Sequence, residues 1–172
     1  MGAVGRTWLA FAAVGAGLIH LALVIGSPAA SAAIFAIVGI VEFAWGLVSI
    51  ATSRLLAPRV ALIGALVPAL FWVLAIFVAS GAHLPQLATS LRVFPLLVAT
   101  LLEFFLAATI AISQRRASEA SEAAVPSSTA RQLLGIAAGV IVIAALTAPA
   151  LAATQVGELA VPPGTFDDHS GH

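Results

Sequence analysis

From Thr7 to Val41 the chain reads TWLAFAAVGAGLIHLALVIGSPAASAAIFAIVGIV, a run without a single Asp, Glu, Lys or Arg. Only the Gly-Ser-Pro triplet at 26–28 interrupts it, and this combination is typical of a turn. About 20 consecutive apolar residues are enough to cross the hydrocarbon core of a bilayer. The stretch therefore predicts two membrane-spanning helices joined by a short turn, at about 8–25 and 32–52.

The rest of the chain continues this pattern. Apolar runs at about 60–84, 93–112 and 132–153 predict three further spans, and Pro68 predicts a kink inside the first of them. The stretch 113–131, SQRRASEASEAAVPSSTAR, is instead rich in Ser, Ala, Glu and Arg, which is typical of a solvated linker.

The predicted fold class is all-α: an integral membrane protein with a four-helix bundle and a fifth transmembrane helix. The bundle, residues 1–112, would consist of two tandem helical hairpins at about 8–52 and 60–112. It would be followed by a cytoplasmic linker at 113–131, the fifth helix at 132–153 and an exported flexible tail at 154–172.

Matching patterns indicate that the two hairpins are copies of one another. Each copy has a Trp in its first helix, a His-Leu pair near the end of that helix, and a Glu-Phe pair in its second helix. The ionisable residues follow the same order, His20 and Glu42 in the first copy, His83 and Glu103 in the second. Chance alignment of Ala-rich apolar segments is the alternative, but the matching order and spacing favour a parallel tandem repeat.

The composition fits a membrane protein and excludes several function classes. Hydrophobic residues make up 62% of the chain and charged residues only 8%, whereas a soluble domain carries about 25% charged residues. There is no Cys, which removes disulfides, thiolate metal sites and iron–sulfur clusters. All seven basic residues are Arg, which excludes a nucleotide-binding P-loop because that motif needs Lys. The net charge of zero disfavours nucleic acid as a partner, and no nucleophile–base constellation indicates an enzyme.

The arginines predict the orientation of the chain in the membrane. Six of the seven lie before the first span, between the second and third, or between the fourth and fifth, and Arg92 is the exception. Since Lys and Arg accumulate in cytoplasmic loops, we expect a plasma-membrane protein with a cytoplasmic N-terminus and an extracytoplasmic C-terminus. Arg6 and the small residues at 27–33 also resemble a cleavable signal peptide, but the apolar run exceeds the usual length of about 7–15 residues.

Two ionisable residues are expected to meet inside the membrane. A charged group at the bilayer centre costs about 2.5–3.5 kcal/mol on the insertion scale, so it normally faces the protein interior and has a partner. His20 lies near the end of an outward-running helix and Glu42 lies midway along the returning one, and side chains lean toward the N-terminus of their own helix. The two should therefore converge. Glu103 and His83 would form a weaker second site, because His83 lies at or beyond the end of its span.

Three interpretations of this cluster are open. In the first, His20 and Glu42 bind each other and hold the helices together. In the second, they form a metal or proton site, since intramembrane carboxylates paired with His are typical of ion pathways. The third, ligation of a b-type haem by His20 and His83, is disfavoured because both histidines would have to lie at one depth.

The C-terminal tail carries a second set of candidate metal ligands, Asp167, Asp168, His169 and His172. Nitrogen and oxygen ligands without thiolate suit a borderline ion such as zinc or copper(II). An unstructured acidic end without a specific ligand is the alternative, because the Pro-Pro-Gly at 162–164 disfavours a folded tail.

Four short motifs carry a resemblance to other membrane proteins: Gly17–Leu21, Phe71–Trp72, Leu101–Glu103 and His169–His172. The chain resembles a loosely defined group of small bacterial polytopic membrane proteins with a His-ending exported tail. The resemblance implies a membrane-embedded helical fold and brings no established activity.

Together these features favour a membrane protein that handles a divalent metal ion, copper or zinc, or protons at His20 and Glu42, with the tail capturing ions. The alternative is a non-catalytic accessory or assembly subunit of a larger membrane complex, such as a respiratory complex. The lipid bilayer is the expected surrounding in both cases, and a homo-oligomer is compatible with either.

Overall fold

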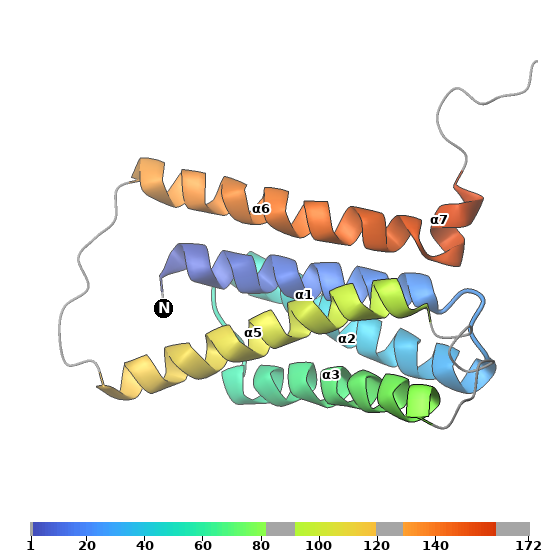
Figure 1. Ribbon diagram of the computed structural model, residues 1–172. Coiled ribbons are helices and arrows are strands. Elements are labelled where there is room, and N and C mark those ends of the chain that lie inside the picture. Colours follow the sequence, from blue (N-terminus) through green and yellow to red (C-terminus); the bar gives the residue numbers. More distant parts are fainter. Residues whose placement is uncertain (1, 82–91, 120–128, 161–172) are drawn as a thin grey trace, which may run out of the picture.

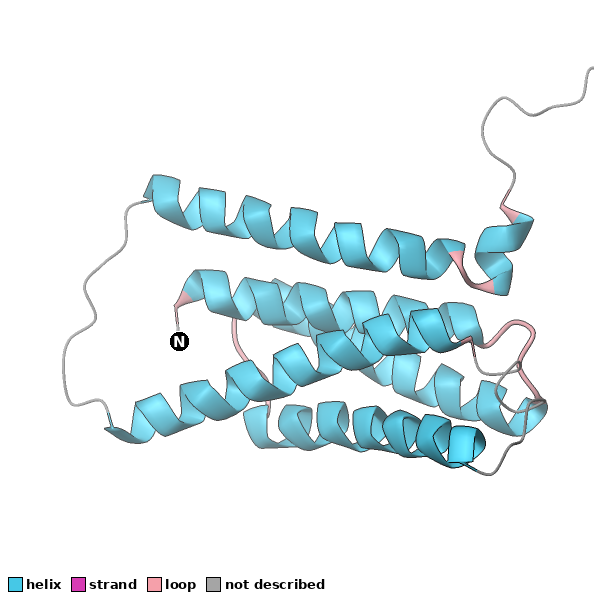
Figure 2. Cartoon of the chain, in the orientation of Figure 1, coloured by secondary structure: helices cyan, strands magenta, loops and turns pink. Residues whose placement is uncertain are grey.

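The computed structural model describes residues 2–81, 92–119 and 129–160, and the regular elements in these ranges are all helices (Figures 1 and 2). They are α1 (Ala3–Leu23), α2 (Ala29–Thr52), α3 (Pro58–Gly81), α5 (Val93–Glu119), α6 (Thr129–Ala152) and the short α7 (Gln155–Leu159). The five long helices have the length and apolar composition needed to cross a membrane. The described part of the chain is therefore all-helical, and the protein is a multi-pass membrane protein.

Two polar segments that the sequence predicts to be a linker and a tail are partly helical. α5 continues to Glu119, although the composition predicts a linker from residue 113. Ala, Gln, Arg and Glu are good helix formers, so this helix extends beyond its apolar part. α7 lies in the segment expected to be a flexible tail, and Thr154 caps it by accepting a hydrogen bond from the Gly157 N–H at 3.3 Å.

α1 is the central helix of the structure. It packs against α2, α5 and α6, whereas α3 packs against α5 (Figure 1). α2 and α3 follow each other in the chain but have no comparable interface within the described residues. The turn between them contains Ser53 (φ 51°) and Ala57 (φ 42°), two non-glycine residues in the left-handed region.

Glycines allow α1 and α2 to come into close contact. A Cβ at Gly39 would lie 2.9 Å from the carbonyl oxygen of Gly17, and one at Gly46 would lie 2.8 Å from that of Ala10. Small residues at such positions let helix backbones approach each other in a membrane. Glu42 lies on the same face of α2, between the two glycines, so this contact directs its side chain toward α1.

Hydrogen bonds attach the C-terminal helices to the rest of the molecule at both ends. One end of the molecule carries the N-terminus and every arginine except Arg92, and we call it the arginine end. There the Trp8 indole donates to the carbonyl oxygen of Gly135 at 2.7 Å. At the opposite end Arg92 donates to the carbonyl oxygen of Ala153 at 2.9 Å. Its guanidinium also forms a bidentate ion pair with Glu158 of α7, at 2.8 and 3.1 Å. This Arg92–Glu158 pair connects the start of α5 with α7.

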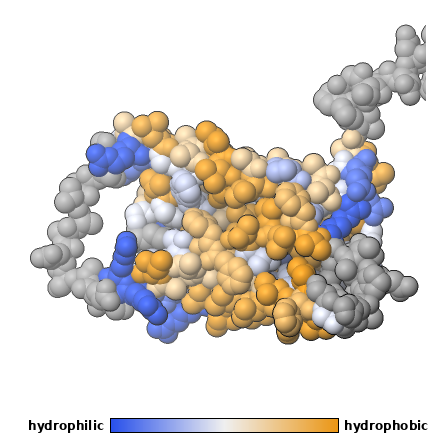
Figure 3. Space-filling model, viewed as in Figure 1, coloured by the Kyte–Doolittle hydropathy of each residue, from blue (hydrophilic) through white to orange (hydrophobic). Residues whose placement is uncertain are grey.

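The outer surface has the pattern of a membrane protein. Apolar side chains cover the middle of the molecule, and hydrophilic residues gather toward its two ends (Figure 3). The apolar surface includes large exposed side chains of α2 and α3, such as Ile37, Val41, Val60 and Phe77. An apolar band of this kind matches the hydrocarbon core of a bilayer.

Candidate metal centre

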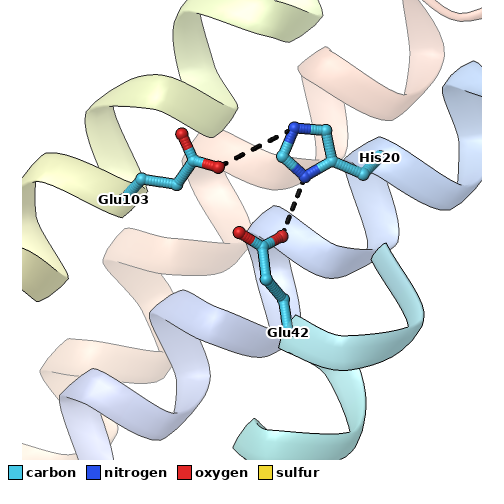
Figure 4. A group of neighbouring side chains, drawn as sticks. All are labelled: His20, Glu42 and Glu103. Carbon is cyan, nitrogen blue, oxygen red and sulfur yellow. Dashed lines mark hydrogen bonds and ion pairs between the residues drawn. The ribbon is translucent and has the colours of Figure 1, made fainter. Parts of the chain in front are cut away.

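Three ionisable side chains from three different helices meet between α1, α2 and α5 (Figure 4). Nδ1 of His20 on α1 lies 2.8 Å from Oε2 of Glu42 on α2, which is a hydrogen-bond distance. On the other side of the imidazole ring, Nε2 lies 3.9 Å from Oε1 of Glu103 on α5. This second distance is too long for a hydrogen bond but short enough for an ion pair. We refer to His20, Glu42 and Glu103 as the membrane triad.

The membrane triad is buried and incompletely hydrogen-bonded. The exposed fraction of the side chain is 0% for His20, 1% for Glu103 and 12% for Glu42. Within the described residues, His20 Nε2 and both carboxyl oxygens of Glu103 have no hydrogen-bond partner. Buried polar groups normally have partners, and one left unpaired costs about 1–3 kcal/mol. These atoms therefore mark a place where a proton, an ion or a ligand group is expected.

An aromatic row covers the face of the imidazole ring. Phe35 of α2 stacks against His20, with ring centroids 6.0 Å apart and an interplanar angle of 22°. Trp72 of α3 in turn stacks on Phe35, at 4.5 Å and 20°. Phe35 thus covers a face of the imidazole, while the two ring nitrogens at its edge face the carboxyl groups of Glu42 and Glu103.

Helix geometry explains why these three residues meet. α2 and α5 both start at the end of the molecule where α1 ends, and they run back along it (Figure 1). With a rise of 1.5 Å per residue, Glu42 and Glu103 lie about 20 and 15 Å along their helices. The two carboxylates therefore reach similar levels on two faces of α1, and His20 lies between them.

The charges of the membrane triad do not balance by themselves. With His20 neutral and both carboxyl groups ionised, the cluster carries two negative charges. The nearest arginines on the same helices, Arg6 and Arg115, lie roughly three to four helical turns away. Since net charge within hydrocarbon is costly, the membrane triad requires protons or a cation to become neutral.

The three residues form a suitable ligand set for a divalent metal ion. One ligand atom from each residue lies within 4.8 Å of those from the other two. Ligand atoms around a tetrahedral ion with bonds of about 2.0–2.1 Å are roughly 3.3 Å apart, so modest side-chain rotations would close the set and leave a fourth position open. One imidazole nitrogen and two carboxylate oxygens suit zinc or copper(II) better than copper(I).

The structure brings together three of the four intramembrane residues expected at a site. His20 and Glu42 are in contact, as their depths and side-chain directions predict. Glu103, which the repeat pairs with His83, lies on the other side of His20. His83 and the tail ligands at 167–172 lie outside the described residues, so their roles stay predictions.

Sequence reasoning missed Glu103 as a third member of the first site, and also the aromatic row of Phe35 and Trp72. A signal for Glu103 was available, because it is placed at about the same depth as Glu42. Hydropathy gave no comparable signal for Phe35, and Trp72 stood out only through the Phe71–Trp72 motif and the repeat, neither of which indicates a contact with the site.

Comparison with protein-family models, with curated proteins and with solved structures gives no match for this chain. Its function is therefore inferred from the membrane triad, in which two carboxyl groups and an imidazole are buried among apolar helices.

Proposed function

We propose that the protein binds a borderline divalent metal ion, zinc or copper(II), at the membrane triad and releases protons as the ion binds. The supporting observation is that His20 Nε2 and the Glu103 carboxyl group face each other, buried and without hydrogen-bond partners among the described residues. A cluster with a purely structural role would be expected to pair these atoms.

Charge neutrality connects the metal ion with protons. A divalent ion would cancel the two negative charges of the deprotonated membrane triad. Two protons would do the same, for example one on His20 and one on Glu103, with an ionised Glu42 bound to the imidazolium. Because metal ligands must be deprotonated and neither neutral state leaves net charge in the membrane, binding of one ion should displace about two protons.

The expected topology indicates on which side of the membrane this exchange would take place. The positive-inside rule places the arginine end, with the N-terminus, in the cytoplasm and the tail outside the plasma membrane. His20 lies in the last turn of α1, so the membrane triad would lie in the outer half of the bilayer. Tail residues would then collect ions at the outer surface, through Asp167, Asp168, His169 and His172.

The proposed architecture is a four-helix bundle of two tandem hairpins, with α6 as the fifth span. The first hairpin, α1 and α2, supplies His20 and Glu42, and the second, α3 and α5, supplies Glu103. A site shared between the copies would explain why the carboxylates of both converge on one imidazole.

Zinc titration of the purified protein tests this proposal directly. The full chain would carry His169→Asn and His172→Asn so that the tail histidines do not contribute. Calorimetric titration in two buffers of different protonation enthalpy gives the stoichiometry, the affinity and the number of protons released. We expect one ion per chain and close to two protons per ion.

Single substitutions then assign the ligands. Glu42→Gln, Glu103→Gln and His20→Gln should each weaken zinc binding by more than tenfold, because each replaces a carboxylate oxygen or an imidazole nitrogen by a neutral amide, which is a weaker ligand for zinc. Glu158→Gln is the matched control, since it makes the same change in a carboxylate outside the membrane triad. The proposal would be refuted if zinc and copper(II) bind to all three triad variants as tightly as to the wild type. It would also be refuted if neither ion binds.

An accessory subunit is the second candidate function. It is favoured by the His20–Glu42 hydrogen bond of 2.8 Å, which can by itself hold α1 and α2 together. Purification in a mild detergent distinguishes the candidates. A stoichiometric partner protein without bound metal supports the accessory role, whereas a metal-binding chain that purifies alone contradicts it.

A further inference from the structure

A cavity of about 120 Å³ lies directly beside the membrane triad. Its walls come from α1, α2, α3 and α5, and Glu42 and Glu103 are its ionisable lining residues. Part of its wall is formed by α2 and α3, which contact each other elsewhere through the stacked rings of Phe35 and Trp72. Val41 and Val60 belong to this part of the wall, and both are well exposed on the surface that faces lipid.

The lining of the cavity suits a lipophilic molecule better than a hydrated ion. Apart from the two carboxyl groups and the Trp45 indole, the described lining consists of small and aliphatic residues, among them Ala61, Gly64 and Ala65. Such walls offer a metal ion no oxygen or nitrogen atoms to replace its water. The metal ion is therefore not expected to enter through this cavity, and the cavity suits a different ligand.

The size of the cavity limits the occupant. An apolar cavity of about 150 Å³ is known to accommodate benzene. A space of about 120 Å³ that is also open on one side can therefore take a group about the size of one aromatic ring. A longer hydrocarbon chain attached to that group would extend between α2 and α3 into the bilayer.

The charges of the lining determine what kind of head group is expected. Both carboxyl oxygens of Glu103 are buried and lack a hydrogen-bond partner within the described residues, and no Arg lines the cavity. The Trp45 indole also lines it and is held in place by a hydrogen bond from Nε1 to the carbonyl oxygen of Leu56, at 2.9 Å. Carboxylates together with an indole ring attract organic cations.

We propose that this cavity binds a lipophilic organic cation with a head group about one aromatic ring in size, which enters from the bilayer between α2 and α3. Its single positive charge, together with one proton on the membrane triad, would balance the two carboxyl groups of Glu42 and Glu103. The inference shares these two carboxylates with the proposed metal site but depends on a cavity that the metal does not need. The organic cation and zinc should therefore compete.

Binding of a tritium-labelled quaternary amine, benzyldimethyldodecylammonium, tests the proposal. The full-length protein would be placed in phosphatidylcholine nanodiscs, with empty nanodiscs as the blank for partitioning into lipid. We expect saturable binding of one amine per chain that excess zinc displaces. The uncharged N-benzyldodecanamide, which has a similar shape, should bind at least tenfold more weakly because it lacks the positive charge.

Two glycine substitutions on α3 separate the cavity from the metal site. Gly64 lines the cavity, and a Cβ there would have no neighbour within 4 Å, so Gly64→Leu should fill the space without disturbing the backbone. We expect it to weaken amine binding at least tenfold and to leave zinc binding unchanged. Gly81→Leu is the matched control, because its Cβ also has open space on the same helix but lies away from the cavity.

The outcomes distinguish this inference from the metal proposal. Zinc binding without amine binding, equal binding of the uncharged analogue, or amine binding unaffected by Gly64→Leu would each overturn the cavity proposal and leave the metal proposal standing. Amine binding that is lost in Gly64→Leu, in a protein that binds no metal ion, would support the cavity proposal and refute the other.

Discussion

The membrane triad and the Arg92–Glu158 pair use similar chemical groups in opposite ways. Arg92 and Glu158 form a bidentate ion pair whose side chains are 29% and 60% exposed. His20 and Glu103 are almost fully buried, yet they approach only to 3.9 Å and have unpaired polar atoms within the described part of the chain. The exposed cluster is complete, and the buried cluster is not.

The difference indicates that the exposed pair attaches one helix to another, whereas the buried cluster is suited to bind a ligand. A satisfied ion pair at the end of the helices holds α7 to the start of α5 and needs nothing further. A pair of carboxyl groups within the span could have been replaced by apolar residues at a gain in stability, since burial of unpaired polar groups is unfavourable. Its presence supports the proposal that a ligand completes it.

The largest effect is expected when the helices that form the membrane triad are forced apart. Gly39→Val would place a Cβ 2.9 Å from the carbonyl oxygen of Gly17, which is backbone and cannot rotate away. We expect a loss of about 3 kcal/mol in the free energy of unfolding, at the upper end of overpacking effects, together with the loss of zinc binding. Denaturant titration in detergent measures the first and calorimetry the second.

Gly81→Val is the matched control for this substitution, because a Cβ at Gly81 meets no atom within 4 Å. If Gly39→Val is as stable as Gly81→Val, the close contact between α1 and α2 does not position the membrane triad.

A smaller effect, opposite in sign, is expected for Glu103→Leu. Replacing a buried, unpaired carboxyl group with an apolar side chain of similar size should stabilise the fold by about 1–3 kcal/mol while abolishing metal binding. Thermal unfolding of the metal-free protein, compared with wild type, measures the gain. A clear loss of stability would mean that Glu103 has a structural role, and the contrast between the two clusters would not hold.

The smallest effect is expected for the Arg92–Glu158 pair, because exposed ion pairs are weak and screened by salt. The hydrogen bond from Arg92 lowers the pKa of the Glu158 carboxyl group, so the pair stabilises the fold above the ordinary carboxyl pKa of about 4.3. This stabilisation should disappear as the pH falls through the lowered pKa.

The measurement for this pair is the difference in unfolding midpoint between wild type and Glu158→Gln as a function of pH. The difference should favour wild type near neutral pH, shrink in high salt and vanish in strongly acidic solution. A difference that grows on acidification would contradict the assigned ion pair.

Much of the fold could be predicted from hydropathy, because each long helix coincides with an apolar run that the bilayer requires. The His20–Glu42 contact was also predictable, since two helices joined by a short turn must be neighbours and their side-chain directions follow from helix geometry. The exact helix ends were not, as the extension of α5 to Glu119 depends on helix propensity in water rather than on hydropathy.

The convergence of Glu103 on His20 could not be derived from a local pattern. Depth along the membrane is encoded in each helix, but the choice of neighbours among non-consecutive helices depends on how all of their faces pack. Gly15 illustrates the difficulty: its small size suits a close contact with any helix, and in the structure it faces Thr147 of α6.

The turn between α2 and α3 has a consequence for how this protein can diversify. Ser53 and Ala57 adopt left-handed backbone without being glycine, and farther along the two helices that they join, the rings of Phe35 and Trp72 stack at 4.5 Å. The separation of α2 and α3 is thus set by the main chain of the turn at one end and by this ring stack farther along the helices. Cavity-lining residues between the turn and the ring stack, such as Ala61, are therefore expected to tolerate exchange for a differently shaped ligand without a change in this separation.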